Sequence, residues 1–407
     1  MIRPATAVLA LGLTQIIGYG TLYYSFSVLA PGMGQEFGLS TEWMFAAFSV
    51  SLLISGLSAP WIGAWIDRAG AGRVMTVGSL VAALALGACA LAANSAMLVG
   101  GLIAIQIASA LVQYTSSFTL LVQINPARAQ RTITQLTLIA GFSSTLFWPL
   151  TSALHDHMDW HHVYGLFAVL HLVICFPVHA WLMVKTRQNI DRRSGIAPVV
   201  PASPPVTGLV DAAARPRAFG LMLVGFAVQS FVTSTFLVHM LPMLTGLGLA
   251  QASVLVASVF GPAQVLSRFT NMTFGGRLSQ RTLAIIASVF LPLATGILLL
   301  TAPNLAGAFA FAIVFGLSSG LASIVQGTLP LELFGSDGYG RRLGRLTSVR
   351  LVVSSAAPFA FALMTERLGI PGALSIIAGL GTVAVIAFLA IGPLLGRGRD
   401  GASGKQA

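Results

Sequence analysis

The chain has 407 residues, of which 56% are hydrophobic and only 8% are charged. A soluble domain is typically about 25% charged, so this composition excludes a water-soluble globular protein and indicates a membrane protein. In a soluble protein the net charge of +11 would suggest nucleic acid as a partner. In a membrane protein, basic residues that gather on the cytoplasmic side explain the same charge. We therefore expect a lipid bilayer, and no nucleic acid, as the partner of this surface.

Apolar runs follow one another along the whole chain. A spanning helix needs about 20 apolar residues, and these runs are too long and too continuously apolar for the alternating strands of a barrel. We predict an all-α integral membrane protein with twelve transmembrane helices. The first run could be taken for a signal peptide, but eleven more follow, so we interpret it as a retained span. The predicted spans are 5–30, 43–66, 73–93, 97–124, 132–154, 163–185, 218–245, 252–274, 282–302, 305–333, 343–365 and 371–395.

The distribution of basic residues predicts the orientation. All but three of the 22 lysines and arginines lie at the N-terminus, in the connections after even-numbered spans, or in the C-terminal tail; the exceptions are Arg268, Arg350 and Arg367. Short cytoplasmic connections carry the excess of positive charge in membrane proteins. Both termini are therefore expected in the cytoplasm, in a bacterial-type cytoplasmic (inner) membrane.

A connection rich in proline and basic residues divides the chain in two. We predict an N-terminal six-helix half at 1–185, a flexible cytoplasmic linker at 186–217, a C-terminal six-helix half at 218–395 and a cytoplasmic tail at 396–407. The two bundles are expected to be pseudo-symmetric. Many secondary transporters are built from such repeats, with the binding site between them near the middle of the membrane. A monomer is the default expectation for such a carrier.

The loop between spans 2 and 3 reads GAWIDRAGAGR at 63–73, and a weaker copy, GGRLSQR, joins spans 8 and 9 at 275–281. The first string resembles the loop signature of the major facilitator superfamily, and the twelve spans and central linker fit that family along the whole chain. The second copy departs from it, because Gly276 stands where the acid would be. The resemblance implies a conformational gate that holds the cytoplasmic side together in the outward-open state. Its residues would be Gly63, Asp67, Arg68, Gly70, Arg73 and Arg277.

The residue types agree with a gate. Asp67 can accept hydrogen bonds from the N-terminus of a neighbouring helix or pair with a cytoplasmic arginine. The alternative is a plain solvated loop charge.

Two arginines lie within apolar segments that hold no deep Asp or Glu. A charge at the centre of a bilayer costs at least about 2.5–3.5 kcal/mol, so such residues usually face water, a partner or a substrate. Arg268 and Arg350 therefore predict a site for a mobile anion, because guanidinium presents a planar fork that matches a carboxylate. The alternatives are snorkelling for either residue and phosphate contact for Arg350, which lies nearer the cytoplasmic end.

The segments around these arginines add a finer resemblance. Residues 261–268, GPAQVLSR, look like the helix-8 arginine motif of the monocarboxylate transporter and oxalate/formate antiporter families, and residues 344–350, GRLTSVR, look like the oxalate/formate segment. The resemblance implies that Arg268 and Arg350 bind substrate carboxylates. The chain departs from the monocarboxylate pattern at Gln264, where that family has aspartate, and in span 1, where Tyr23 and Tyr24 stand in place of a lysine.

Polar side chains at helical spacing extend the predicted site. Membrane glutamines often only bridge helices, and the tyrosines could equally serve packing. His239 is the titratable group expected near the outer part of the cavity, where it could carry a coupled proton or be a structural histidine. The predicted substrate-binding residues are Arg268, Arg350, Gln264, Tyr19, Tyr23, Gln113, Gln229 and Gln326.

The sequence holds no phosphate loop, nucleophile triad or paired catalytic carboxylates, so neither enzymatic chemistry nor a cofactor is expected. The histidines at 155–162 are expected to be surface residues and not a metal site. We predict a secondary active or facilitative transporter of a small organic anion, a mono- or dicarboxylate, that works by alternating access. Anion exchange or uniport is favoured over proton symport. A proton-coupled drug or amphipathic-compound exporter is the alternative; a non-transporting sensor and a sugar porter fit less well.

Overall fold

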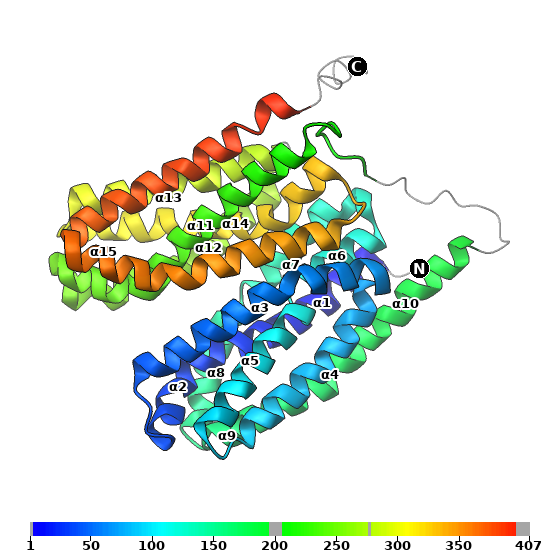
Figure 1. Cartoon of the computed structure of the whole chain (residues 1–407), viewed down its shortest axis with the longest axis horizontal. Helices are drawn as coiled ribbons and strands as arrows, with labels where there is room; N and C mark the ends of the chain where they lie inside the picture. Colours follow the sequence, from blue (N-terminus) through cyan, green and yellow to red (C-terminus); the bar gives the residue numbers. More distant parts are fainter. Residues whose placement is uncertain (1–2, 195–205, 276–277, 396–407) are drawn as a thin grey trace.

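The computed structural model describes residues 3–194, 206–275 and 278–395, and within these ranges the chain is helical apart from turns, short connections and two isolated β-bridges. The helices form two groups (Figure 1), α1–α10 from the first half of the chain and α11–α15 from the second. The groups lie side by side near the end where the termini are drawn, and they diverge toward the opposite end. We call these the terminal end and the far end.

The first group begins with a continuous apolar rod in which a π-helix, Gly20–Tyr24, separates α1 from α2; a second π-helix, His171–Cys175, separates α9 from α10. The helices are α1 (Pro4–Tyr19), α2 (Ser25–Glu36), α3 (Thr41–Ala69), α4 (Ala71–Ala90), α5 (Ser95–Val112), α6 (Tyr114–Ile124), α7 (Ala129–Ala140), α8 (Ser143–His155), α9 (Trp160–Leu170) and α10 (Phe176–Ser194).

The second group contains the two longest continuous segments, and each turns on a glycine with positive φ: Gly248 (φ 84°) before α12, and Gly369 (φ 69°) inside α15. Glycine has no Cβ and adopts this backbone conformation at little cost. The helices are α11 (Arg215–Leu244), α12 (Ser253–Phe274), α13 (Gln280–Thr301), α14 (Leu305–Phe334) and α15 (Tyr339–Leu389). In the described part of the chain, nine segments are long and apolar enough to cross a membrane.

Two rods of the first group are broken near their middles, α5/α6 at Gln113 and α7/α8 at Gly141–Phe142. A helix break in lipid is tolerated only where the freed backbone groups find partners within the protein. At the first break, the side-chain amide of Gln15 donates to the carbonyl of Val112 at 2.8 Å. At the second break, the partner is a side chain of the other group.

Within the stretch predicted as the linker, 186–217, α10 runs on to Ser194 and α11 begins at Arg215. The part from residue 206 onward lies along the end of α14. The amides of Leu209 and Val210 donate to the carbonyls of Glu332 and Leu333, each at 3.1 Å. The middle of the linker, and the predicted tail at 396–407, lie outside the described residues.

Candidate functional site

Arg268 lies between the two groups of helices and is only 4% exposed. It projects from α12, where its Nε donates to Ser323 Oγ of α14 at 3.0 Å. Its Nη1 donates at 3.0 Å to the carbonyl of Thr137, in the last turn of α7. Arg268 therefore connects the second group with the broken rod of the first.

Arg350 occupies a similar setting on α15. Its Nε donates to Ser230 Oγ of α11 at 2.9 Å, and its Nη1 donates to Gln326 Oε1 of α14. Ser323 and Gln326 are three residues apart on α14, so they lie on one face with Cβ atoms about 5–6 Å apart. The two arginines come from separate helices, α12 and α15, and their side chains thus contact adjacent positions on one turn of α14.

The partners of both guanidinium groups are all neutral. Within the described ranges, ion pairs join only His161 to Glu36 and His162 to Asp159, all four near the far end. Within the same ranges, the Nη2 groups of Arg268 and Arg350 have no hydrogen-bond partner. A buried charge at Arg268 and a half-buried one at Arg350, each with a free N–H face, are suited to an anion that the protein itself does not provide.

Three tyrosines of the first group lie near the arginines. Tyr19 lies within electrostatic range of both guanidinium groups, and Tyr24 and Tyr114 lie within range of Arg268. The rings of Tyr19 and Tyr114 pack with centroids 4.9 Å apart. Tyr23 packs on Tyr24, with centroids 5.4 Å apart. Of the two predicted tyrosines, Tyr19 is therefore the one placed beside the charges.

The predicted glutamines fall into two kinds. Gln326 holds Arg350, and Gln264 donates to Ser319 Oγ at 2.8 Å, so both bridge helices. Gln113 and Gln229 each keep a buried side-chain Nε2 without a hydrogen-bond partner. A buried N–H without a partner costs about 1–3 kcal/mol, so these two donors are candidates for a ligand contact.

His239 lies on α11, nine residues beyond Ser230, the partner of Arg350, and contacts α15. Its Nε2 is 2.9 Å from the carbonyl of Pro358, and its ring lies 5.1 Å from that of Phe361. Because a carbonyl only accepts, Nε2 carries the proton. The side chain thus bridges two helices of one group.

Asp67, a predicted gate residue, bridges the two groups at the terminal end. Its carboxylate accepts the backbone N–H groups of Gly340 at 2.8 Å and Arg341 at 2.7 Å, in the first turn of α15. A carboxylate there satisfies orphan donors and interacts favourably with the helix dipole. The contact is one of the two that the sequence suggested for Asp67.

Gly63 makes this contact possible, because it lets α3 and α15 approach closely. A Cβ at position 63 would overlap the carbonyl oxygen of Gly340 and lie 3.0 Å from the Cα of Gly344. Gly56, two turns earlier on α3, lies against Leu351 in the same way. Small residues at a helix interface allow such backbone contact in membranes.

The other predicted gate residues are less engaged. Gly70 takes φ 85° between α3 and α4, which lets the chain turn. Arg68 is exposed and donates only to the carbonyl of Ala64 in its own helix, at 3.2 Å. Arg73 is exposed. Arg277 lies outside the described residues.

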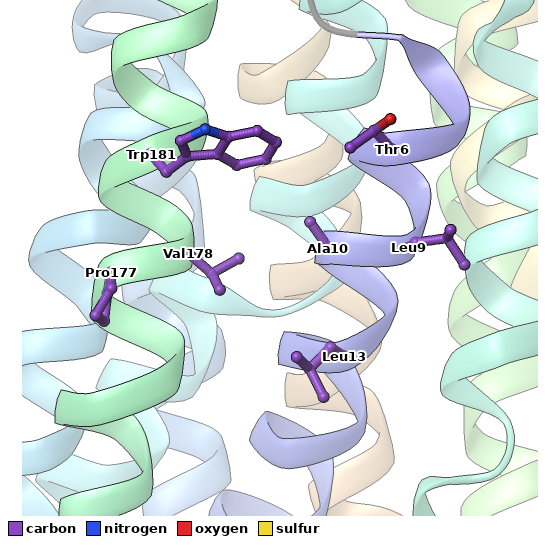
Figure 2. A pocket seen from close by; sticks show the side chains of 7 residues that line it. All are labelled: Thr6, Leu9, Ala10, Leu13, Pro177, Val178 and Trp181. Atoms are coloured by element: carbon purple, nitrogen blue, oxygen red, sulfur yellow. The ribbon is translucent and has the colours of Figure 1, made fainter.

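An apolar groove of about 500 Å³ lies elsewhere, between α1 and α10 (Figure 2). Trp181 and Val178 face Thr6 and Ala10 across it. Its walls carry no charge and hold neither arginine, so it does not belong to the site. Within the described ranges, no group of three His, Cys, Asp or Glu residues could hold a metal ion.

Sequence reasoning missed three contributors to the site: Tyr114, Thr137 and Gly141. Helical spacing along span 4 selected Gln113, but the break at Gln113 changes the direction in which Tyr114 points. Thr137 contributes a backbone carbonyl, which side-chain patterns do not reveal. Gly141 was the one available signal, since a glycine within an apolar span can mark a helix break or a close approach.

Two groups of helices that are long and apolar enough to cross a membrane define a multi-pass membrane protein. The sequence profile of the Major Facilitator Superfamily matches residues 11–362, and the chain belongs to that family, whose members are membrane transporters and not enzymes. A search of curated proteins finds no match.

Solved structures share the fold. The human organic anion transporter MFSD10 (TETRAN) superposes with a TM-score of 0.72 at 14% identity, covering 95% of this chain and 100% of that one. The transporter FucP in its outward conformation gives 0.67 at 12% identity, covering 96% and 98%. The proton:xylose symporter XylE gives 0.67 at 12% identity, covering 95% and 96%. At such identities these similarities concern the fold alone.

Proposed function

We propose that this protein moves a small organic anion, a mono- or dicarboxylate, across a bacterial-type cytoplasmic membrane, with Arg268 and Arg350 binding the carboxylate groups. One observation carries the proposal: the guanidinium groups of buried Arg268 and half-buried Arg350 lie against one turn of α14, without a carboxylate partner in the described part of the chain. The resemblance of both arginine segments to carboxylate carriers supports the same substrate class. The solved structures do not decide it, because they include sugar symporters.

Transport would follow alternating access of two six-helix halves, with both termini cytoplasmic and the protein acting as a monomer. Two observations support twelve crossings. Of the nine apolar segments in the described part of the chain, Arg215–Phe274 and Tyr339–Leu394 are each long enough to cross twice. Helices α7 and α8 together add one more, broken crossing. The contacts at the terminal end, and the divergence at the far end, support an outward-open state (Figure 1).

The anion would enter from the far end and meet the free Nη2 groups of both arginines. A carboxylate binds a guanidinium through two parallel hydrogen bonds, and the hydroxyl groups of Tyr19 and Tyr114 can donate to its remaining oxygen sites. A dicarboxylate could engage both arginines at once. Gln113 and Gln229 offer further N–H donors.

Transport in reconstituted vesicles tests this proposal. Wild-type protein, Arg268→Gln and Arg350→Gln would be compared for uptake of labelled acetate, lactate, oxalate and succinate. Arg345→Gln is the matched control, since Arg345 is an exposed arginine on the same helix as Arg350. We expect uptake of one carboxylate class, abolished in the first two variants and retained in the control. Uptake of cationic amphiphiles instead, unaffected by Arg268→Gln, would favour the drug-exporter alternative.

A further inference from the structure

The end of α7 provides an unusual partner for Arg268. Helix α7 ends at Ala140, and the carbonyl of Thr137 accepts both the N–H of Gly141 at 3.0 Å and Nη1 of Arg268 at 3.0 Å. Carbonyls in the last turn of a helix carry partial negative charge, and a carbonyl oxygen has two lone pairs, so Thr137 can accept from Arg268 in addition to Gly141. The break in this rod therefore places a weakly anionic group against a buried cation.

The glycine at position 141 serves the contact with Arg268 and not the turn between α7 and α8. Its backbone, at φ −60° and ψ −22°, is ordinary right-handed helix that any residue adopts. A Cβ at this position, however, would overlap Nη1 of Arg268. The glycine therefore makes room for the guanidinium.

The bond crosses the interface that alternating access must open. Helix α7 belongs to the first group and α12 to the second, and α7 also packs on α14 through Ile133 and Gly327. Opening the terminal end separates these helices and breaks the bond between Thr137 and Arg268. A nearly fully buried guanidinium would then lose a partner, which is costly in a membrane.

We propose that the Thr137 carbonyl is an internal substitute for the transported anion on Arg268, and that Gly141 is the positioning residue that admits the guanidinium to it. The inference rests on the proposed function, in which Arg268 binds a carboxylate. The arriving carboxylate takes over the hydrogen bond of Nη1, neutralises the charge of Arg268, and releases α7 from α12. The empty carrier stays closed at the terminal end, and the loaded carrier opens there.

The test uses a cysteine reporter at the interface. Thr115 is 8% exposed and touches Thr347 across the two groups, Oγ1 to Oγ1 at 3.1 Å. Thr115→Cys would be alkylated only when the groups separate, and the native Cys89 and Cys175 are buried. The probe is whichever of acetate, lactate, oxalate and succinate gives the largest thermal shift.

In the otherwise wild-type protein, saturating probe should raise the alkylation rate about tenfold, which requires a tenfold preference of the probe for the open state. Gly141→Ala should be alkylated rapidly without probe, and saturating probe should raise its alkylation rate by less than about twofold. Gly165→Ala is the control, because a Cβ there meets nothing within 4 Å, and it should behave as wild type.

Affinity separates positioning from simple structural damage. Gly141→Ala should bind the probe at least as tightly as wild type, since the competing carbonyl is removed, whereas general damage would weaken binding. If no carboxylate binds the wild type, the proposed function fails. If one binds but leaves alkylation of the wild type unchanged, only this inference is overturned. That wild-type measurement decides the matter even if Gly141→Ala does not fold.

Discussion

Replacing the carboxylate of the predicted gate, Asp67→Asn, should open the terminal end of the empty protein. The wild-type carboxylate accepts two N–H groups at 2.7–2.8 Å in the first turn of α15. Asparagine keeps one acceptor oxygen, turns an NH₂ group toward the other N–H, and loses the negative charge. One charge-assisted hydrogen bond contributes about 1.5–3 kcal/mol, and the interaction with the helix dipole about 0.3–1 kcal/mol.

Because Asp67 is only partly buried, we take the lower part of this range, about 2 kcal/mol, which corresponds to about 30-fold in the equilibrium between closed and open states. Alkylation of the Thr115→Cys reporter measures that equilibrium. Asp156→Asn, the same substitution on an exposed residue near the far end, should leave the rate unchanged. The reasoning is refuted if Asp67→Asn is alkylated no faster than wild type while the protein remains folded.

Three further variants probe the gate, the site and the proton path. Gly63→Ala should force α3 from α15 and cost about 1–3 kcal/mol of the closed state, seen as faster alkylation of the same reporter, whereas Gly87→Ala, with open space around its Cβ, should have no effect. Gln113→Met should leave the melting temperature unchanged or raised, because it removes a buried N–H without a partner, yet weaken carboxylate binding; unchanged binding would remove this residue from the site. His239→Asn should lower the melting temperature, because it loosens the contact with Pro358, and should leave the dependence of uptake on pH as in wild type. Loss of that pH dependence would instead make His239 the proton carrier.

The coarse fold follows from the sequence for a clear physical reason. Lipid requires continuous helices of about 20 apolar residues, so the helical architecture was predictable. The breaks were not, because the one at Gln113 has neither glycine nor proline, and a carbonyl within the span is stabilised there by Gln15 from another helix. Their positions depend on partners that only the tertiary structure supplies.

The site was predictable to the extent that it consists of charged side chains. Arg268 and Arg350 were apparent because a charge in an apolar run is costly, and Asp67 because its loop resembles a family signature. Gln326 was selected by helical spacing, and the structure places it on Arg350. The carbonyl of Thr137 and the orientation of Tyr114 were not predictable, since backbone acceptors leave no pattern and a break resets the helical phase.

The central claim, that Arg268 binds a substrate carboxylate, is tested most directly by thermal unfolding of the purified protein in detergent with acetate, lactate, oxalate and succinate, repeated on Arg268→Ala. A ligand at 100 times its Kd stabilises the folded state by about 2.7 kcal/mol. We predict stabilisation by one carboxylate class in wild type and none in Arg268→Ala. Stabilisation of equal size in the variant, or by cationic amphiphiles and no carboxylate, would contradict the proposed site.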